Sequence, residues 1–162
     1  MKIFLLRHGQ SEARATSDEL RHLSNEGLSD IRAVARQFIK REESLTRCIC
    51  SPYLRAQESA VAFLKEAACE CALQTDAILV PEKSPQEVLG FLSSLEQQES
   101  ILLVGHNPCL TALFAMLTQG ATDHPLKIME AGELCCIECE VPAAGLGTCQ
   151  YCLQAVALTT SA

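Results

Sequence analysis

Residues 2–9 read KIFLLRHG, a short apolar run that is followed at once by an arginine, a histidine and a glycine. The run from Lys2 to Leu6 has the length and apolar character of a strand that is covered on both faces, as strands of a parallel sheet are. Arg7, His8 and Gly9 then lie at the carboxyl end of that strand, where ligands bind in open α/β sheets. The stretch therefore predicts a buried strand with a candidate site at its end.

Strand-like runs and helical patterns alternate along the rest of the chain. The other apolar runs that we predict as strands of this sheet are Arg47–Cys50, Ala77–Val80 and Ile101–Val104. Apolar residues at i, i+3 and i+4 spacing predict helices over residues 28–39, 56–67, 84–95 and 107–120. The last helix is expected to begin at Asn107-Pro108, a capping residue followed by proline at the first helical position, and to end near Gly120.

Such alternation predicts the α/β class, as a three-layer α/β/α sandwich with a largely parallel central sheet. The C-terminal part differs, because Glu133–Val141 and Thr148–Leu158 flank the turn-like sequence PAAGLG. This pattern predicts an antiparallel hairpin at the end of the sheet. We find no repeat or linker, so residues 1–162 are expected to form a single domain.

Composition excludes several classes of function. The net charge is −7 and no block of lysines and arginines occurs, which argues against a nucleic-acid partner because phosphate backbones require a clustered basic face. No apolar stretch is long enough to cross a bilayer, and the first residues lack the apolar core and cleavage site of a signal peptide. We therefore expect a cytoplasmic protein without a membrane partner.

Two further segments place cationic side chains at strand ends. Residues 51–56, SPYLRA, follow the second predicted strand and contain Arg55, and residues 105–108, GHNP, follow the fourth and contain His106. Both should converge with Arg7 and His8 at one edge of the sheet. Because His106 also precedes a helix N-terminus, the set would combine fixed charge with a helix dipole, and phosphate is the natural occupant.

With its RHG at 7–9, SPYLRA at 51–56 and GH at 105–106, the sequence resembles the histidine phosphatase superfamily, whose fold is that of phosphoglycerate mutase. The short length, the lack of a long insertion, and SDELRHLS at 17–24 make it similar to SixA-type phosphohistidine phosphatases. The resemblance implies that His8 is the nucleophile, that Arg7, Arg55 and His106 hold the phosphoryl group, and that Arg21 also points into the pocket. It further implies a phosphohistidine-containing partner, either a histidine phosphotransfer domain or a carrier protein, and no metal or cofactor.

The chemistry fits these residue types. A neutral imidazole nitrogen on His8 can attack phosphorus and carry the group covalently, and planar guanidinium groups can bind two phosphoryl oxygens at once. We expect a cationic His106 when phosphate is bound. Glu82, after the third predicted strand, and Asp18, beside Arg21, are the possible general acids, although phosphohistidine has a leaving group that does not need a strong one.

Several alternatives remain at this point. The same pocket suits a phosphatase of small phosphomonoesters, or a phosphate-binding module without turnover. Arg21 could simply pair with Asp18 or Glu19 on the surface, and Glu82 could be an ordinary loop carboxylate.

The cysteines offer a different interpretation, as a metal or redox protein. Cys136 and Cys139, followed by Cys149 and Cys152, have the spacing of a four-thiolate zinc site. Both pairs fall inside predicted strands, however, where residues three apart point to opposite faces. We therefore predict no metal site and interpret the ten cysteines as mostly buried, reduced thiols.

Overall fold

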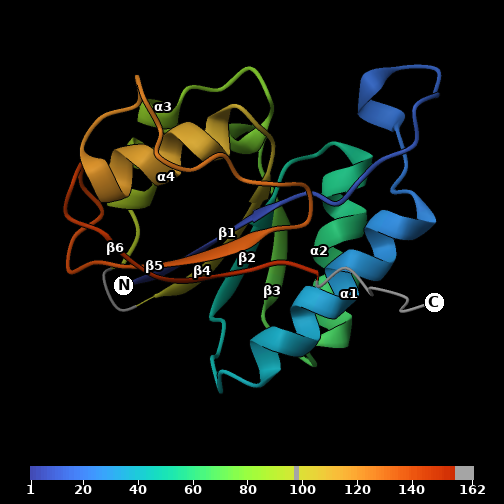
Figure 1. The fold of residues 1–162 in the computed structure, drawn as a ribbon, viewed down its shortest axis with the longest axis horizontal. Coiled ribbons are helices and arrows are strands. Elements are labelled where there is room, and N and C mark those ends of the chain that lie inside the picture. The colour runs from blue at the N-terminus through green and yellow to red at the C-terminus, as the bar shows by residue number, and fades with distance from the viewer. Residues whose placement is uncertain (97–98, 156–162) are drawn as a thin grey trace, which may run out of the picture.

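The computed structural model describes residues 1–96 and 99–155, which form one six-stranded sheet flanked by helices (Figure 1). The strand order is β3-β2-β4-β1-β5-β6. The strands are β1 (Lys2–Arg7), β2 (Arg47–Cys50), β3 (Ala72–Thr75), β4 (Ser100–Gly105), β5 (Leu134–Glu138) and β6 (Thr148–Leu153). The first four are mutually parallel, whereas β5 and β6 are antiparallel to their neighbours. The predicted α/β class and the largely parallel sheet with a C-terminal hairpin are confirmed.

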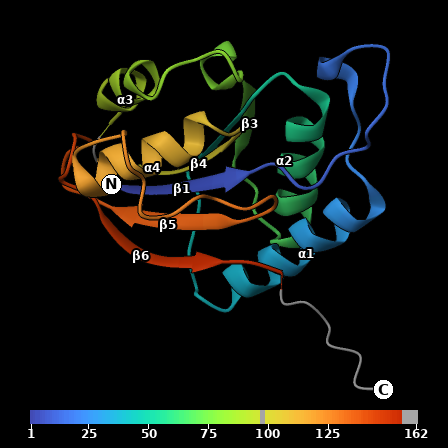
Figure 2. The ribbon, with the colours of Figure 1, turned by 45° about the horizontal axis from the view of Figure 1, so that its top comes forward.

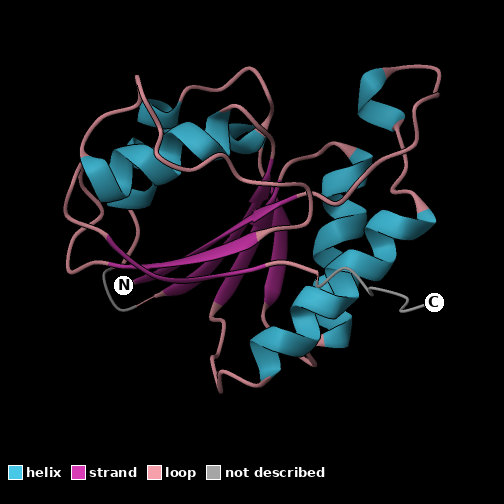
Figure 3. Ribbon diagram, viewed as in Figure 1, coloured by secondary structure: helices cyan, strands magenta, loops and turns pink. Residues whose placement is uncertain are grey.

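Two helices cover each face of the sheet (Figure 2). Helices α1 (Asn25–Ile39) and α2 (Leu54–Glu66) pack on one face, and α3 (Pro85–Ser93) and α4 (Cys109–Gln119) on the other. Two 3₁₀ helices, η1 (Asp18–Leu20) and η2 (Ala77–Leu79), lie in the connections. Figure 3 shows how the strands run between these two helical layers. No helix among the described residues is both long enough and apolar enough to cross a membrane.

Strand β1 illustrates why the sheet is buried on both faces. Phe4 and Leu6 enter the core beneath α1 and α2, while Ile3 and Leu5 enter the core beneath α3 and α4. All four residues are fully buried. Successive side chains of a strand point to opposite faces, and both faces of this strand are buried. Every position therefore carries an apolar residue, which explains the uninterrupted apolar run in the sequence.

The third strand was predicted in the wrong place. Residues 77–79 form η2, in which the Asp76 side chain accepts a hydrogen bond from Ile78 N at 2.8 Å, and Leu79 is buried in the α3/α4 core. The actual strand, β3, is the preceding stretch and is exposed at all four residues. An exposed edge strand does not need apolar residues, so the apolar run identified a buried turn instead.

The predicted start of the last helix is wrong by one residue. Pro108 occupies the N-cap and Cys109 is the first helical residue, while the Asn107 side chain bonds to Thr111 Oγ1 and to the carbonyl oxygen of Met129. The predicted end is confirmed, because Gly120 adopts φ +78° and donates its N–H to Met116 O.

The hairpin strands are shorter than predicted. Strand β5 ends at Glu138 and not at Val141, and residues 156–158 of the predicted second strand lie outside the described part of the chain. The pairing of β5 with β6 also shifts register between Cys136 and Ile137, which oppose Tyr151 and Cys149 and leave Gln150 unpaired. Such a bulge changes the direction of the side chains that follow it.

Candidate active site

The carboxyl ends of β1, β2 and β4 bring together the two arginines and two histidines that the sequence singled out. Arg7 is the last residue of β1 and His8 follows it, His106 follows β4, and Arg55 lies in the first turn of α2 just after β2. Arg55 Nε donates to His8 Nε2 at 3.2 Å, and the rings of His8 and His106 lie 4.9 Å apart between centroids. The predicted convergence of these side chains is present in the structure.

The His8 ring is held in one orientation. Its Nδ1 lies 2.7 Å from the carbonyl oxygen of Gly9, an acceptor, so Nδ1 carries the proton and Nε2 keeps its lone pair. Burial lowers the pKa of His8 to about 4, and the charges of Arg55, Arg7 and Arg21 act in the same direction. At neutral pH the ring is therefore uncharged, although it lies among cations.

Gly9 permits this arrangement through its size. A Cβ atom at Gly9 would lie 2.8 Å from the carbonyl oxygen of Gly27, in the first turn of α1. The Gly9 N–H also donates to Ser59 Oγ of α2 at 3.1 Å. The glycine of the RHG segment thus lets the loop after β1 press against two helices.

His106 is 2% exposed and its Nε2 lies 2.8 Å from Ser51 Oγ. Burial lowers the pKa of His106 to about 3, with further lowering by the charges of His8 and Arg55. The ring is therefore neutral, whereas the cation that we expect requires a bound anion. Its Nδ1, like Arg7 Nε, is buried without a hydrogen-bond partner among the described residues. Buried polar atoms of this kind are normally paired with a protein group, a ligand or water.

Asp18 bridges Arg55 and Arg21. Arg55 Nη1 donates to the Asp18 backbone oxygen at 2.6 Å and Nη2 to Oδ2 at 2.9 Å, while Arg21 Nε lies 3.0 Å from Oδ1. The hydrogen bond from Arg55 lowers the pKa of Asp18, helped by the charges of Arg55 and Arg21. The predicted surface pair between Arg21 and Asp18 is thus present, yet Arg21 is also close enough to act on His8. A carboxyl with a lowered pKa is a poor proton donor at neutral pH, which argues against Asp18 as the general acid.

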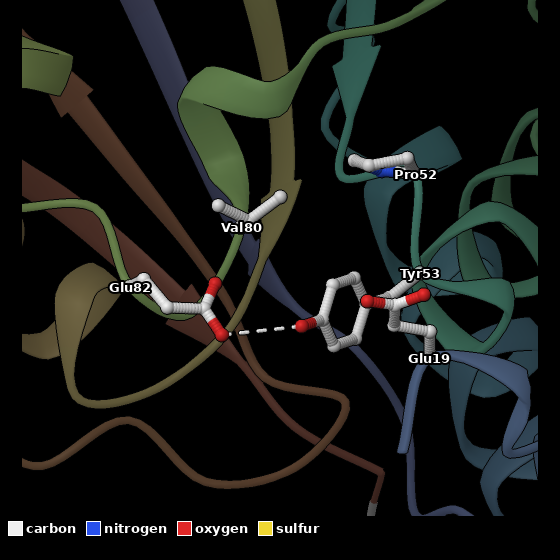
Figure 4. Close-up of a pocket in the computed structure, with 5 residues that line it drawn as sticks. All are labelled: Glu19, Pro52, Tyr53, Val80 and Glu82. Atoms are coloured by element: carbon white, nitrogen blue, oxygen red, sulfur yellow. Dashed lines mark hydrogen bonds between the residues drawn. The ribbon is translucent and has the colours of Figure 1, made fainter. Parts of the chain in front are cut away.

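Glu82 lies in a separate hollow beside the histidines. Its Oε1 accepts a hydrogen bond from the Tyr53 hydroxyl at 3.2 Å, and the Tyr53 ring packs edge-on against His106 with 5.0 Å between centroids. Figure 4 shows the two groups facing each other across a pocket of about 280 Å³ that Glu19, Pro52 and Val80 also line. Glu82 is therefore connected to the site through Tyr53, which the sequence analysis did not single out.

A backbone group that sequence patterns do not reveal also positions the site. The carbonyl oxygen of Met129 accepts hydrogen bonds from Arg7 Nη1 at 2.8 Å and from Asn107 Nδ2 at 2.9 Å. The Arg7 N–H donates in turn to the carbonyl oxygen of Glu133 at 3.1 Å. The loop before β5 thus fixes the side chain and the backbone of Arg7.

Comparison with known proteins agrees with this geometry. Residues 3–79 match the model of the histidine phosphatase superfamily (branch 1). The phosphohistidine phosphatase SixA of Escherichia coli (strain K12) is 30% identical over 128 residues, which are 75% of this chain and 77% of the relative. The chain belongs to the SixA family of histidine phosphatases. The SixA homolog of Haemophilus influenzae is 32% identical over 127 residues, 72% of this chain and 77% of that protein.

The fold of this SixA-family chain is also found in solved structures. The structure of protein histidine phosphatase SixA complexed with tungstate superposes with a TM-score of 0.85 at 24% identity, covering 95% of this chain and 97% of the other. Family and fold together support phosphatase activity for this chain.

Proposed function

We propose that the protein removes phosphate from phosphohistidine on another protein, through a covalent phosphohistidine intermediate on His8. The observation that carries this proposal is the state of His8. Its Nδ1–H is tied to Gly9 O, its pKa is lowered to about 4, and Nε2 is left unprotonated beside Arg55. A partly buried, neutral imidazole with a cation at its reactive nitrogen suits attack on an anionic phosphoryl group.

In the first step of this scheme, His8 Nε2 forms a bond to phosphorus as the phosphorus–nitrogen bond of the substrate breaks. The substrate imidazole, already protonated at its other nitrogen, leaves as a neutral base, so no strong enzymatic acid is needed. Arg7, Arg55, Arg21 and His106 bind the phosphoryl oxygens, where charge accumulates in the transition state. In the second step water attacks phosphorus, the bond to His8 breaks, and inorganic phosphate is released.

The scheme assigns Asp18 a positioning function. Its carboxylate forms ion pairs with Arg55 and Arg21. A phosphoryl group brings more charge and more acceptor oxygens than one carboxylate, so it can take over hydrogen bonds that Asp18 accepts. Asp18 is 59% exposed and can move aside without disturbing the core.

A protein substrate is supported by the open surroundings of the site. The Tyr53–Glu82 hollow is lined in part by Glu19 of η1, and a second hollow of about 480 Å³ is lined by Arg14, Asp18 and Arg21. Leu20 of η1 is 53% exposed. The named activity of the relatives and the tungstate complex, a tetrahedral oxyanion, support the same substrate class. The proposed partner is a histidine phosphotransfer domain or carrier protein in the cytoplasm.

The test compares phosphate release from a phosphohistidine protein with release from a panel of small phosphomonoesters, with a metal chelator present. We expect rapid hydrolysis of phosphohistidine by the wild type and none by His8→Ala. His124→Ala, at an exposed histidine outside the site, is the matched control and should keep full activity.

Each other outcome points elsewhere. Faster turnover of one small ester would replace the proposal with a small-molecule phosphatase that uses the same pocket. Tight phosphate binding without turnover of any substrate would indicate a binding module. Trapping of ³²P-labelled wild type at alkaline pH, where phosphohistidine persists, tests the intermediate separately, and label retained in His8→Ala would exclude His8 as its carrier.

A further inference from the structure

The C-terminal hairpin gathers three thiols on one of its faces. Cys135 of β5 lies directly opposite Cys152 of β6, with 2.6 Å between their Sγ atoms. The bulge at Gln150 breaks the alternation of side chains along β6, so Cys149 lies on the same face and its Sγ is 3.8 Å from that of Cys152. The prediction that residues three apart point to opposite faces is therefore wrong for Cys149 and Cys152.

The other predicted pair does not join them. Cys136 is buried under α1 and α2, and Cys139 lies in the core under α3 and α4. These two residues do point to opposite faces, as the strand period predicts. The four-thiolate set suggested by the sequence spacing is thus not formed.

A buried carboxylate completes the cluster instead. Glu133 is 1% exposed, and the ligand atoms of Glu133, Cys135 and Cys152 all lie within 4.8 Å of one another. Glu133 Oε2 accepts the Glu130 N–H at 2.8 Å. Oε1 forms an ion pair with the Lys127 ammonium. A buried carboxylate beside thiols is costly unless a cation compensates it.

We propose that Glu133, Cys135, Cys149 and Cys152 bind one thiophilic divalent cation, with zinc as the preferred ion. Zinc in structural sites takes four protein ligands in a tetrahedron, with zinc–sulfur bonds of about 2.3 Å, which places the sulfur atoms about 3.8 Å apart. Cys149 and Cys152 already have this separation. Rotation of the half-buried Cys152 side chain opens its contact with Cys135 to the same distance, and the thiols release their protons on binding.

The Lys127 ammonium pairs with the Glu133 oxygen that the metal would use. Its side chain is 32% exposed, so it can withdraw to solvent when a divalent ion takes Glu133 Oε1. A disulfide between Cys135 and Cys152 is the competing use of these groups. It would engage two of the four groups and leave the Glu133 carboxylate uncompensated apart from Lys127, whereas a cation engages all four.

Metal binding is measured on the tag-free full chain, stripped with chelator under reducing conditions, reloaded with zinc and desalted. We expect one zinc per wild-type chain, and a thiolate-to-metal charge-transfer band when cobalt replaces zinc. Cys149→Ser, at an exposed position, should weaken zinc binding about tenfold or more without disturbing packing. The double variant Cys135→Ser/Cys152→Ser should retain no zinc.

The matched control is Cys69→Ser/Cys71→Ser, which removes two half-buried thiols outside the cluster and should keep one zinc per chain. Zinc should also raise the melting temperature of the wild type and of this control, and that of Cys149→Ser much less. The proposal is overturned if the wild type holds no zinc, or if Cys149→Ser binds zinc as tightly as the wild type. Formation of a Cys135–Cys152 disulfide in the presence of zinc would likewise replace it with a redox pair.

Discussion

His8 is a partly buried histidine whose neutral form is favoured, and this makes the pH dependence of its chemistry predictable. Burial together with the neighbouring arginines lowers its pKa to about 4. Attack requires the unprotonated ring, so kcat/KM should fall about tenfold for each pH unit below about pH 4. Above about pH 5, kcat/KM should not change through titration of His8. Initial rates of phosphohistidine hydrolysis measure this pH dependence, with His8→Ala as the blank for acid hydrolysis and circular dichroism to verify folding. A fall in kcat/KM centred near pH 6.5, the ordinary pKa of histidine, would contradict the lowered pKa of His8.

Arg55 uses three donors at once, which a lysine cannot reproduce. Its Nε donates to His8, and Nη1 and Nη2 donate to Asp18. Replacing it by Arg55→Lys keeps the charge and loses the fork, so we expect kcat/KM to fall by about 10²–10³. Arg36→Lys, at an exposed arginine paired with Glu66, serves as the control and should leave kcat/KM unchanged. Equal losses in both variants would show that the effect is general destabilisation.

Much of the site can be predicted from the sequence because the ends of buried strands can be predicted from apolar runs. Arg7, His8 and His106 each follow an apolar run, and Arg55 comes shortly after another, which predicts their common edge. The carbonyl oxygen of Met129 could not be predicted, because every residue has one and only the path of the chain brings this one to Arg7. Tyr53 stands within the SPYLRA segment, yet an uncharged side chain two residues from an arginine carries no signal of its packing on His106.

Replacing a helical glycine by alanine should have opposite effects on stability in α1 and in α3. In α1, a Cβ atom at Gly27 would lie 2.7 Å from Gln10 N, so Gly27→Ala should lower the free energy of unfolding by about 1–3 kcal/mol and disturb the loop after His8. In α3, a Cβ atom at Gly90 would meet no atom within 4 Å, so Gly90→Ala should raise it by about 0.5–1 kcal/mol. Urea titrations of both variants measure the two changes. Stabilisation by Gly27→Ala would refute the close approach.

The start of α3 depends on a capping box. Ser84 Oγ accepts the Glu87 N–H, and Glu87 Oε2 accepts the Ser84 N–H. Ser84→Ala should therefore lower the free energy of unfolding by about 1 kcal/mol. Ser17 occupies the N-cap of η1 without a side-chain hydrogen bond, so Ser17→Ala should have little effect on stability in the same urea titration. Similar losses in the two variants would mean that the cap does not act through its hydrogen bonds.

The elements differ in how well their sequences predict them. Helix α1 carries an apolar face from Ile31 to Phe38 and was predicted to within a few residues, because burial against the sheet requires that period. Strand β3 escaped prediction because it is exposed at every residue and its pairing with β2 depends on backbone hydrogen bonds alone. No glycine or proline in β6 indicates the bulge in the sequence. The bulge brings Cys149 to the same face of the hairpin as Cys152.

For the whole molecule, the two site histidines couple stability to pH. Their pKa values are lowered to about 4 and about 3, whereas in the unfolded chain they are near 6.5. As the pH falls below about 6.5 the unfolded chain binds protons first, so the free energy of unfolding should fall by about 1.4 kcal/mol per pH unit for each histidine. His106→Gln should remove about half of this slope between about pH 6 and pH 4. Chemical denaturation across that range tests it, with the exposed-site variant His124→Ala expected to match the wild type. An unchanged slope in His106→Gln would contradict the burial argument.

Strand β1 pairs with β4 on one side and with β5 on the other, and its register joins Lys2 to Ser100 and to Glu138. During synthesis at about 5–20 residues per second, the ribosome therefore needs roughly 5–20 s after making β1 to make its first partner. Throughout that interval an apolar strand has no edge to join, which is the period when a nascent chain is most exposed to aggregation and to chaperones. Arg7 and His8 cannot meet His106 until β4 has been made, because His106 follows that strand in the chain.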